Sequence, residues 1–247
     1  MEITSTNNDL VKETAKIQQK KYRDITGKFL LEGFKAIEEA YRIGLDIEKI
    51  FVLKEKVQRY EFAKDKLIET NEAVLKKIST TDTAPEAVAV ACRKNFDKEI
   101  LKHARKVILL EGIKDVGNLG TILRCAAAFD VDAIILYGSC TDIYSPKCVR
   151  ASVGNLCKIP VFNMETVEEL QKYFDGFERI ATLPRSKNLL QNFKPQKRML
   201  IMFGSEADGL SQELTEYSTT SVKIEMNPSV ESLNLSISCA IILYNIK

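Results

Sequence analysis

The sequence predicts an α/β fold in two parts: a small α/β domain over residues 1–95 and a larger, mostly parallel-sheet domain over residues 107–247. Short apolar runs alternate with amphipathic helical patterns along the whole chain. In the second part these runs are nearly continuous Val, Ile and Leu, which is typical of parallel strands covered on both faces. The polar stretch over residues 96–106 is expected to link the two parts.

The first part begins with a helical pattern over about residues 8–21. The spacing of apolar residues then predicts a strand at 28–33, a helix at 34–44, a strand at 49–54, a helix to about Thr70, and strands at 73–79 and 87–93. We therefore expect a compact α/β unit that ends near Arg93.

The second part alternates more regularly. Strands are predicted at 106–113, 133–138, 159–163, 179–183, 199–205 and 221–226. Helical patterns near 118–129, 145–153, 165–174 and 211–217 separate them, and a final helix is expected from about Ser232. Ligands of parallel sheets bind beyond the carboxyl ends of the strands, so the loops that follow these strands are the first functional candidates.

Composition limits the classes of function that remain. No apolar run approaches the roughly 18 residues that a membrane span needs, and the start of the chain lacks a signal-peptide pattern, so a soluble cytoplasmic protein is expected. The six cysteines include no Cys-x-x-Cys pair, and the chain has a single histidine, His103. These counts leave zinc sites, redox motifs and histidine-based triads without support, and no metal is expected.

Charge is unevenly distributed along the chain. Residues 1–107 hold 22 Lys and Arg against 18 Asp and Glu, a balance of +4, whereas residues 108–247 hold 14 against 16, a balance of −2. The segment 16–28 holds five basic residues against one acid, Asp24, and such a segment can contact nucleic-acid phosphates by counterion release. A solvated helix face explains the same charges equally well.

A polar turn follows the first strand of the second part. It contains Asp115, Gly117, Asn118 and Gly120, and an Ala-rich helical pattern carrying Arg124 follows it. The glycines do not form Gly-x-Gly-x-x-Gly, so a dinucleotide site is disfavoured. On this loop alone, Arg124 pairs with Asp115, reaches solvent or serves a ligand.

Two further loops follow apolar strands. Residues 202–210 place Glu206 between Gly204 and Gly209, and helix capping by a neighbouring side chain is the simpler explanation for that loop alone. Residues 224–244 place Ser232 and Asn234 at the start of the final helix, where Ser232 suits an N-cap and Asn234 is a poor helix former. Together the three loops present five polar side chains at one sheet edge: Asn118, Arg124, Glu206, Ser232 and Asn234.

These residues resemble the SpoU (TrmH-like) family of RNA ribose 2'-O-methyltransferases, part of the SPOUT class. The family's Asn-x-Gly-x-x-x-Arg motif is matched by Asn118, Gly120 and Arg124. Its Gly-x-Glu-x-x-Gly-Leu motif is matched by Gly204, Glu206, Gly209 and Leu210. Its Ser-Leu-Asn-x-Ser motif is matched by Ser232, Leu233, Asn234 and Ser236, after Ile224 and Met226. Val116 replaces the usual proline of the first motif, and residues 145–162 also resemble the family.

The resemblance extends to the first part, which is similar to an L30e-like substrate-binding domain. It implies a trefoil knot near the carboxyl terminus, an S-adenosylmethionine pocket formed by that knot, and a homodimer packed around it. The cofactor residues implied in this way are Thr182, Leu183, Pro184, Gly204, Ile224, Met226 and Leu233. RNA contacts are expected from Lys20, Lys21, Arg23 and Arg150.

Methyl transfer to a ribose hydroxyl requires alignment of the reacting atoms and removal of a proton. Family proposals assign Arg124 as the base, but a guanidinium with a pKa above about 12 is a poor proton acceptor. We interpret Arg124 as a fork that holds an RNA phosphate, with Glu206 supporting Asn118, and with Asn118, Ser232 and Asn234 orienting the substrates. Ribosomal RNA is favoured as substrate by analogy. Transfer RNA and a non-catalytic RNA-binding role remain alternatives, and both a housekeeping and an antibiotic-resistance role stay open.

Overall fold

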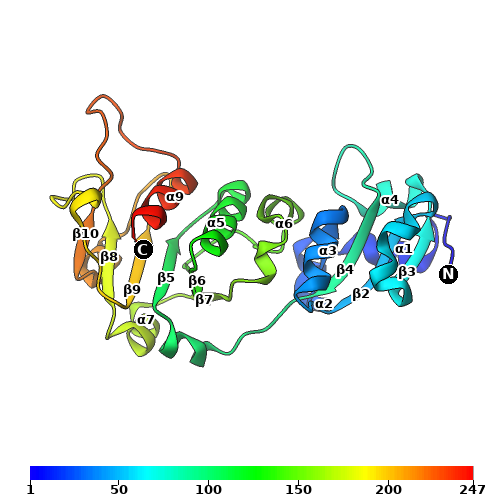
Figure 1. Ribbon diagram of the computed structural model, residues 1–247, viewed down its shortest axis with the longest axis horizontal. Helices are drawn as coiled ribbons and strands as arrows, with labels where there is room; N and C mark the ends of the chain where they lie inside the picture. The colour runs from blue at the N-terminus through cyan, green and yellow to red at the C-terminus, as the bar shows by residue number, and fades with distance from the viewer. Residues whose placement is uncertain (247) are drawn as a thin grey trace. The chain divides into compact units, whose positions relative to one another are not determined.

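The computed structural model describes residues 1–246, in two compact units (Figure 1). Within the described residues, the N-terminal unit comprises residues 1–95 and 142–158, and the C-terminal unit comprises residues 96–141 and 159–246. Within the described part of the chain, no helix combines the length and the apolar character that crossing a membrane requires.

The N-terminal unit is built on a four-stranded mixed sheet with the order β1-β4-β2-β3. β4 pairs antiparallel with β1 and β2, and β3 pairs parallel with β2. The strands are β1 (Lys28–Glu32), β2 (Ile47–Leu53), β3 (Leu67–Thr70) and β4 (Ala87–Cys92). The α-helices are α1 (Asp9–Lys16), α2 (Lys20–Thr26), α3 (Phe34–Arg42), α4 (Glu72–Ile78) and α6 (Pro146–Ser152). Two 3-10 segments, η1 (Lys54–Lys66) and η3 (Asn155–Cys157), complete the unit.

Two predictions for this unit are wrong. Residues 73–79 form helix α4 rather than a strand, because Asn71 caps the helix by accepting from Val74 N at 3.0 Å. Val74, Leu75 and Ile78 then lie on one buried helix face. The helix predicted to Thr70 is instead the 3-10 segment η1, and the chain from Leu67 to Thr70 extends as β3 beside β2.

Residues 142–158 fold with the N-terminal unit, although the sequence places them inside the second part. Helix α6 of this segment contacts β1. Asp142 pairs with Arg23 of α2 at 2.7 Å, and the Tyr144 ring lies 4.9 Å from the Phe29 ring. The two compact units therefore differ at this segment from the predicted domains 1–95 and 107–247 with a linker at 96–106. That domain organisation stays a prediction.

The C-terminal unit contains a six-stranded sheet with the order β10-β8-β9-β5-β6-β7, in which every neighbouring pair is parallel. The strands are β5 (Lys106–Glu111), β6 (Ala133–Tyr137), β7 (Val161–Met164), β8 (Glu178–Thr182), β9 (Met199–Phe203) and β10 (Thr220–Val222). Nearly all residues of β5, β6 and β9 are buried. This confirms the predicted α/β fold with a mostly parallel sheet.

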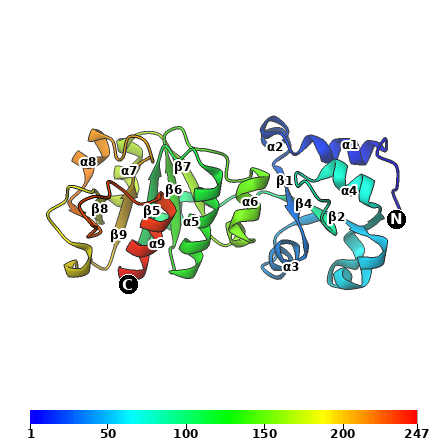
Figure 2. The same cartoon turned by 90° about the horizontal axis from the view of Figure 1, so that it is seen from above.

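Helices cover both faces of this sheet. Figure 2 shows α5 (Val116–Ala128) and α9 (Leu235–Asn245) on one face, with α7 (Val167–Phe174) and α8 (Gln212–Tyr217) on the other. The second face packs Leu170, Phe174 and Leu214 against alternate residues of the strands. Two 3-10 segments, η2 (Lys98–His103) and η4 (Leu190–Asn192), complete the unit.

The last strand and the last helix differ from their predicted limits. β10 ends at Val222 rather than at Met226, and beyond it Lys223 forms only an isolated bridge with Leu189. Helix α9 begins at Leu235 with Asn234 as its N-cap, so the capping role proposed for Ser232 is wrong. The chain from residue 224 to residue 233 is a connection without helix or strand.

Candidate active site

The register of the central strands brings the first two motif loops together. Leu110 near the end of β5 pairs with Phe203 at the end of β9. The loop after β5 leads into α5, whose N-cap Asp115 accepts from Asn118 N at 2.6 Å. The loop after β9 starts at Gly204, beside the end of β5. Asn118 and Glu206 therefore lie at the same edge of the sheet, where ligands of parallel sheets bind.

The loop after β9 folds back on itself. Ser205 N donates to Gly209 O and Gly209 N donates to Ser205 O, both at 3.1 Å. The backbone passes so close to Gly204 that a Cβ atom there would lie 1.9 Å from the carbonyl carbon of Gly209. Gly204 is therefore required by close approach of the backbone, and the tight loop presents Glu206 at its exposed tip.

One chain of hydrogen bonds joins the three motifs. Asn118 Nδ2 donates to Glu206 Oε1 at 2.7 Å, and Asn234 Nδ2 donates to Asn118 Oδ1 at 3.0 Å. Asn234 Oδ1 in turn accepts from the backbone N–H of Ser236 at 2.9 Å and of Ile237 at 3.3 Å. The order Glu206, Asn118, Asn234 thus links the loop after β9, the start of α5 and the start of α9.

Arg124 and Ser232 lie outside this chain of hydrogen bonds. Both residues are exposed, and neither side chain makes a hydrogen bond or ion pair with another residue of the described chain. Arg124 follows Asn118 by six helical residues, which places it about 9 Å further along the axis of α5. It does not pair with Asp115, whose carboxylate caps α5 instead. Of the five predicted polar residues, the structure joins Asn118, Glu206 and Asn234.

The predicted cofactor segments follow the carboxyl ends of β8, β9 and β10. Thr182 Oγ1 donates to Met202 O at 2.9 Å, and Leu183 N donates to Val222 O at 3.0 Å. Pro184 is exposed, whereas Leu183, Ile224, Met226 and Leu233 are half-buried.

The connection after β10 offers main-chain groups to a ligand. The backbone N–H and C=O groups of residues 224–226 make no backbone hydrogen bond within residues 1–246. Backbone groups in such positions normally find partners, and half-buried apolar side chains flank them. This combination suits a ligand with a flat heterocycle and polar edges, and the residues therefore fit the adenosine part of S-adenosylmethionine.

Thiols near the motifs are unsuited to nucleophilic chemistry. Burial raises the pKa of Cys125, which is adjacent to Arg124 in the sequence, and burial also raises the pKa of Cys239 on α9. Both thiols therefore stay protonated near neutral pH, whereas the thiolate is the reactive form.

Within the described residues, no group of three or more potential ligand side chains is arranged to hold a metal ion.

The four predicted RNA-contacting residues occupy different environments. Lys20 and Lys21 of α2 are exposed, and Lys20 pairs with Asp24 at 3.2 Å. Arg150 pairs with Glu32 at 3.3 Å and is only partly exposed. A role in RNA binding therefore stays a prediction for Lys20, Lys21 and Arg150.

The prediction for Arg23 is wrong. Its side chain is 4% exposed, and its guanidinium donates to Asp142 Oδ2 at 2.7 Å and to Gln18 O at 2.6 Å. A buried guanidinium with its donors satisfied in this way cannot reach an RNA phosphate. Arg23 instead holds the segment that starts at Asp142 against α2.

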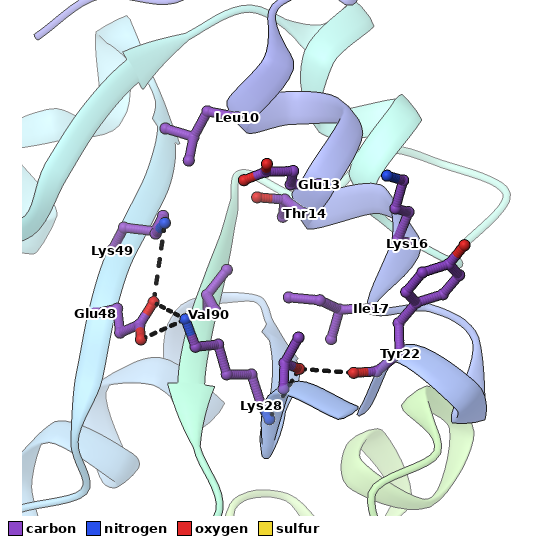
Figure 3. Close-up of a pocket in the computed structure, with 11 residues that line it drawn as sticks. Leu10, Glu13, Thr14, Lys16, Ile17, Tyr22, Lys28, Glu48, Lys49 and Val90 are labelled. Atoms are coloured by element: carbon purple, nitrogen blue, oxygen red, sulfur yellow. Dashed lines mark hydrogen bonds and ion pairs between the residues drawn. The ribbon is translucent and has the colours of Figure 1, made fainter. Parts of the chain in front are cut away.

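Sequence reasoning missed a cavity in the N-terminal unit (Figure 3). It opens between α1, α2 and the sheet, and it is lined by Leu10, Glu13, Thr14, Lys16, Ile17, Tyr22, Thr26, Lys28, Glu48, Lys49 and Val90. These residues come from five separate elements and follow no regular spacing along the sequence. The basic character of segment 16–28 was the only sequence signal that pointed to this region.

Comparison with known proteins adds independent information. The sequence model of the SpoU rRNA methylase family matches residues 105–244, and that of the MRM3-like substrate binding domain matches residues 8–89. An uncharacterised tRNA/rRNA methyltransferase of Synechocystis is 34% identical, over 98% of this chain and 92% of the relative. The 23S rRNA (guanosine(2553)-2'-O)-methyltransferase RlmP of Bacillus subtilis is 28% identical, over 100% and 99%.

Solved structures agree with this relationship. The AdoMet-bound rRNA methyltransferase from Sinorhizobium meliloti superposes with a TM-score of 0.88 at 28% identity, covering 99% of this chain and 96% of the other. The family match covers more than half of the chain and contains all three motifs that carry the hydrogen-bonded site. The chain therefore belongs to the SpoU rRNA methylase family.

Proposed function

We propose that this protein transfers the methyl group of S-adenosylmethionine to a ribose 2'-hydroxyl of ribosomal RNA. The observation that carries the proposal is the hydrogen-bond chain from Glu206 through Asn118 to Asn234, which holds three separate loops at the carboxyl edge of one parallel sheet. The relationship to RlmP over the full length of both chains supports ribosomal RNA as the substrate class.

S-Adenosylmethionine supplies a methyl group on a positively charged sulfur, which leaves as a neutral thioether when the methyl is transferred. Residues Thr182, Leu183, Pro184, Gly204, Ile224, Met226 and Leu233 are the ones proposed to hold it. The main-chain groups of residues 224–226 suit the adenine edge, and the half-buried side chains suit its faces. Correct alignment of reacting groups contributes up to about 7–11 kcal/mol in favourable cases, so holding the ribose and the cofactor rigidly is the main task of the site.

The hydrogen-bond chain gives Glu206 and Asn118 distinct tasks. The Glu206 carboxylate holds the amide of Asn118, and Asn118 connects that loop to Asn234. We assign Glu206 as a positioning residue, and Asn118, Asn234 and Ser232 as groups that orient the ribose and the methionine part of the cofactor. Ser232 is exposed two positions before Asn234, so its hydroxyl is accessible to substrate.

Arg124 is assigned to the RNA. Its guanidinium is exposed and has no partner within the described residues, so it is available to a phosphate in the two-pronged geometry that arginine provides. The proton of the 2'-hydroxyl leaves to a phosphate oxygen or to water, because a guanidinium is a poor acceptor near neutral pH.

Arg124→Lys tests this assignment. We expect kcat/KM to fall by about 10- to 100-fold, the equivalent of one lost charge-assisted hydrogen bond. Arg105→Lys, at an exposed arginine at the start of β5, is the matched control and is expected to keep the activity. Near-normal turnover by Arg124→Lys would contradict a two-pronged contact.

A homodimer completes the proposal. Helix α9 exposes Ile237 and Tyr244, which are 52% and 61% accessible, although the helix also buries Cys239 and Leu243. A helix that is apolar on all sides requires cover on all sides. A second copy packed on α9 provides that cover. The trefoil knot and the cytoplasmic location stay predictions.

The reaction itself is tested by incubating the protein with S-adenosylmethionine that carries a labelled methyl group and with unmodified transcripts of ribosomal RNA or transfer RNA. Digestion to nucleosides is expected to give labelled 2'-O-methyl nucleoside from ribosomal RNA. Label only in transfer RNA would change the substrate class. Binding of S-adenosylmethionine without any transfer, or no binding in calorimetry, would favour a non-catalytic RNA-binding role.

A further inference from the structure

The cavity of the N-terminal unit has the size and the walls of a binding site for a small flat ligand. Its volume is about 260 Å³, below the roughly 300–1,000 Å³ of pockets for drug-sized molecules. Leu10, Ile17 and Val90 form apolar walls, and Tyr22 adds an aromatic ring (Figure 3). Such walls bind a flat heterocycle by burial and stacking.

The charged groups of the cavity fall into two sets. Glu48 is held by Lys28 at 2.6 Å and lies 3.8 Å from Lys49, so its charge is already compensated. Glu13 makes no hydrogen bond or ion pair with another described residue, and it acts on Lys28 only through space, as a smaller cause than Glu48 of the raised pKa of that lysine. Glu13 is therefore the carboxylate that is available to accept hydrogen bonds from a ligand.

Two lysines are available to phosphate: Lys16, which lines the cavity, and Lys21 of α2. Lys16 Nζ lies 5.7 Å from the centre of the Tyr22 ring and has no acidic partner among residues 1–246. Lys21 of α2 is exposed and likewise lacks an acidic partner in the described chain. The cavity offers an aromatic ring and a carboxylate, and the two lysines offer positive charge next to them. These groups suit a ligand that combines a flat base with flanking phosphates.

We propose that this cavity receives one unpaired nucleobase of the RNA substrate, with an amino-bearing edge of the base at Glu13 and the flanking phosphates at Lys16 and Lys21. Proteins that read RNA sequence take up unstacked bases in this way, on aromatic side chains and with hydrogen bonds to the base edges. A carboxylate accepts from the amino groups of adenine, cytosine or guanine, so uracil is disfavoured. The inference rests on the proposed RNA substrate and adds a second contact, made by the N-terminal unit with a base of that RNA.

The test measures the affinity of the full-length protein for transcripts of the large ribosomal RNAs, without cofactor. Tyr22→Ala is expected to weaken binding by about 5- to 150-fold, the effect of one lost base stack. Tyr41→Ala, at a partly exposed tyrosine of α3 outside the cavity, is the matched control and is expected to bind within twofold of the wild type. The thermal unfolding midpoint of each variant separates a local effect from loss of the fold.

Glu13→Ala separates base recognition from simple charge. Removing a negative charge strengthens binding to RNA if the surface acts only electrostatically. If Glu13 accepts from a base, Glu13→Ala instead weakens binding, with an unchanged dependence on salt. Glu61→Ala, at an exposed glutamate of η1 outside the cavity, is the control for charge alone. Tighter binding by Glu13→Ala, or equal affinities for Tyr22→Ala and Tyr41→Ala, would overturn the proposal.

Crosslinking by ultraviolet light supplies a direct readout. Mass spectrometry of the irradiated complex is expected to find a nucleotide on the peptide that spans residues 13–28, carrying adenine, cytosine or guanine. Adducts confined to other peptides would also overturn the proposal. Because these measurements detect binding without methyl transfer, a wild-type protein that binds RNA in the cavity but transfers no methyl group contradicts only the proposed reaction.

Discussion

Asn118 is the residue that connects the three motif loops. Its amide donates to Glu206 Oε1 and accepts from Asn234 Nδ2, while its backbone N–H donates to the capping carboxylate of Asp115. An amide side chain offers a donor to one neighbour and an acceptor to the other. Asparagine at this position is therefore explained by hydrogen bonding in two directions.

Exchanging the amide and the carboxylate tests this geometry. Asn118→Asp places a second carboxylate against Glu206, and we expect kcat to fall at least about tenfold because neighbouring pairs of this kind couple by up to about 3 kcal/mol. The double variant Asn118→Asp with Glu206→Gln reverses the direction of one hydrogen bond and keeps the other. It is expected to regain part of the lost activity. A double variant that is no better than Asn118→Asp would show that the contact does not matter.

Gly204 provides a steric test in the loop after β9. Gly204→Ala introduces a Cβ atom 1.9 Å from the Gly209 carbonyl carbon, so the loop must open. We expect binding of S-adenosylmethionine to fall at least tenfold in calorimetry. Gly209→Ala is the matched control in the same loop, since it has open space and costs only about 1–2 kcal/mol for its φ of +71°. Wild-type affinity of Gly204→Ala would contradict the proposed cofactor position.

Buried thiols predict how stability changes with pH. Burial raises the pKa of Cys148 and of Cys157 to about 12, whereas unfolding returns each thiol to its ordinary value near 9. The neutral thiols stabilise the fold fully below about pH 9, and this contribution is lost as pH rises toward 12.

The free energy of unfolding is therefore expected to decrease above about pH 9, by up to about 1.4 kcal/mol per pH unit for each thiol. Urea unfolding under reducing conditions at pH 8, 9.5 and 10.5 measures it. The variant Cys148→Ala with Cys157→Ala is expected to show a shallower decrease. An unchanged slope in that variant would assign the pH dependence to other groups.

Among the elements, the start of α9 combines a structural and a functional task. Asn234 caps the helix with its Oδ1 atom and reaches Asn118 with its Nδ2 atom. The sequence suggested Ser232 for the cap because serine is among the favoured capping residues. Both residues suit an N-cap, so the choice depends on the contact with Asn118, which is 116 positions away in the chain.

Two substitutions separate these tasks. Asn234→Asp keeps an oxygen for the cap and loses the donor to Asn118, so we expect wild-type stability with reduced methyl transfer. Asn234→Ala loses both the capping oxygen and the donor to Asn118, so we expect reduced methyl transfer and a loss of about 1 kcal/mol in the free energy of unfolding. Thermal unfolding and the methyl-transfer assay measure the two effects, with Ser232→Ala as the stability control. A drop in stability for Asn234→Asp equal to that for Asn234→Ala would contradict the capping role.

Prediction of elements succeeded where local pattern determines the structure. The strands β5, β6 and β9 have short, continuous apolar sequences rich in branched residues, which are typical of buried strands. Residues 73–79 were predicted wrongly because apolar residues 73–75 were interpreted as a strand, although Asn71 before an acidic first turn is a helix-start signal. The short strand β3 depends on its partner β2, which no local pattern encodes.

At the scale of the whole molecule, the sequence was sufficient for the α/β fold and for the three loops, because carboxyl ends of parallel strands share one edge. It was insufficient for contacts between distant residues. Arg23 was predicted to bind RNA because it lies in a basic segment, but its partner Asp142 is 119 positions away and buries it. The cavity around Tyr22 likewise arises only when α1, α2 and the sheet come together.

The proposed homodimer is tested by sedimentation. Ile237→Glu combined with Tyr244→Glu places two charges on the exposed apolar face of α9, and a shift from the mass of a dimer to that of a monomer is expected. Ile25→Glu, at a more exposed isoleucine of α2 with 69% accessibility, is the control and is expected to remain dimeric. A monomeric wild-type protein would contradict the dimer.

The most direct measurement is a map of 2'-O-methyl groups in the ribosomal RNA of cells that carry or lack this gene. We expect one ribose methylation to disappear with the gene, to return with the wild-type protein, and to stay absent or weak when Asn118→Asp or Arg124→Lys is supplied instead. Identical maps with and without the gene would contradict it.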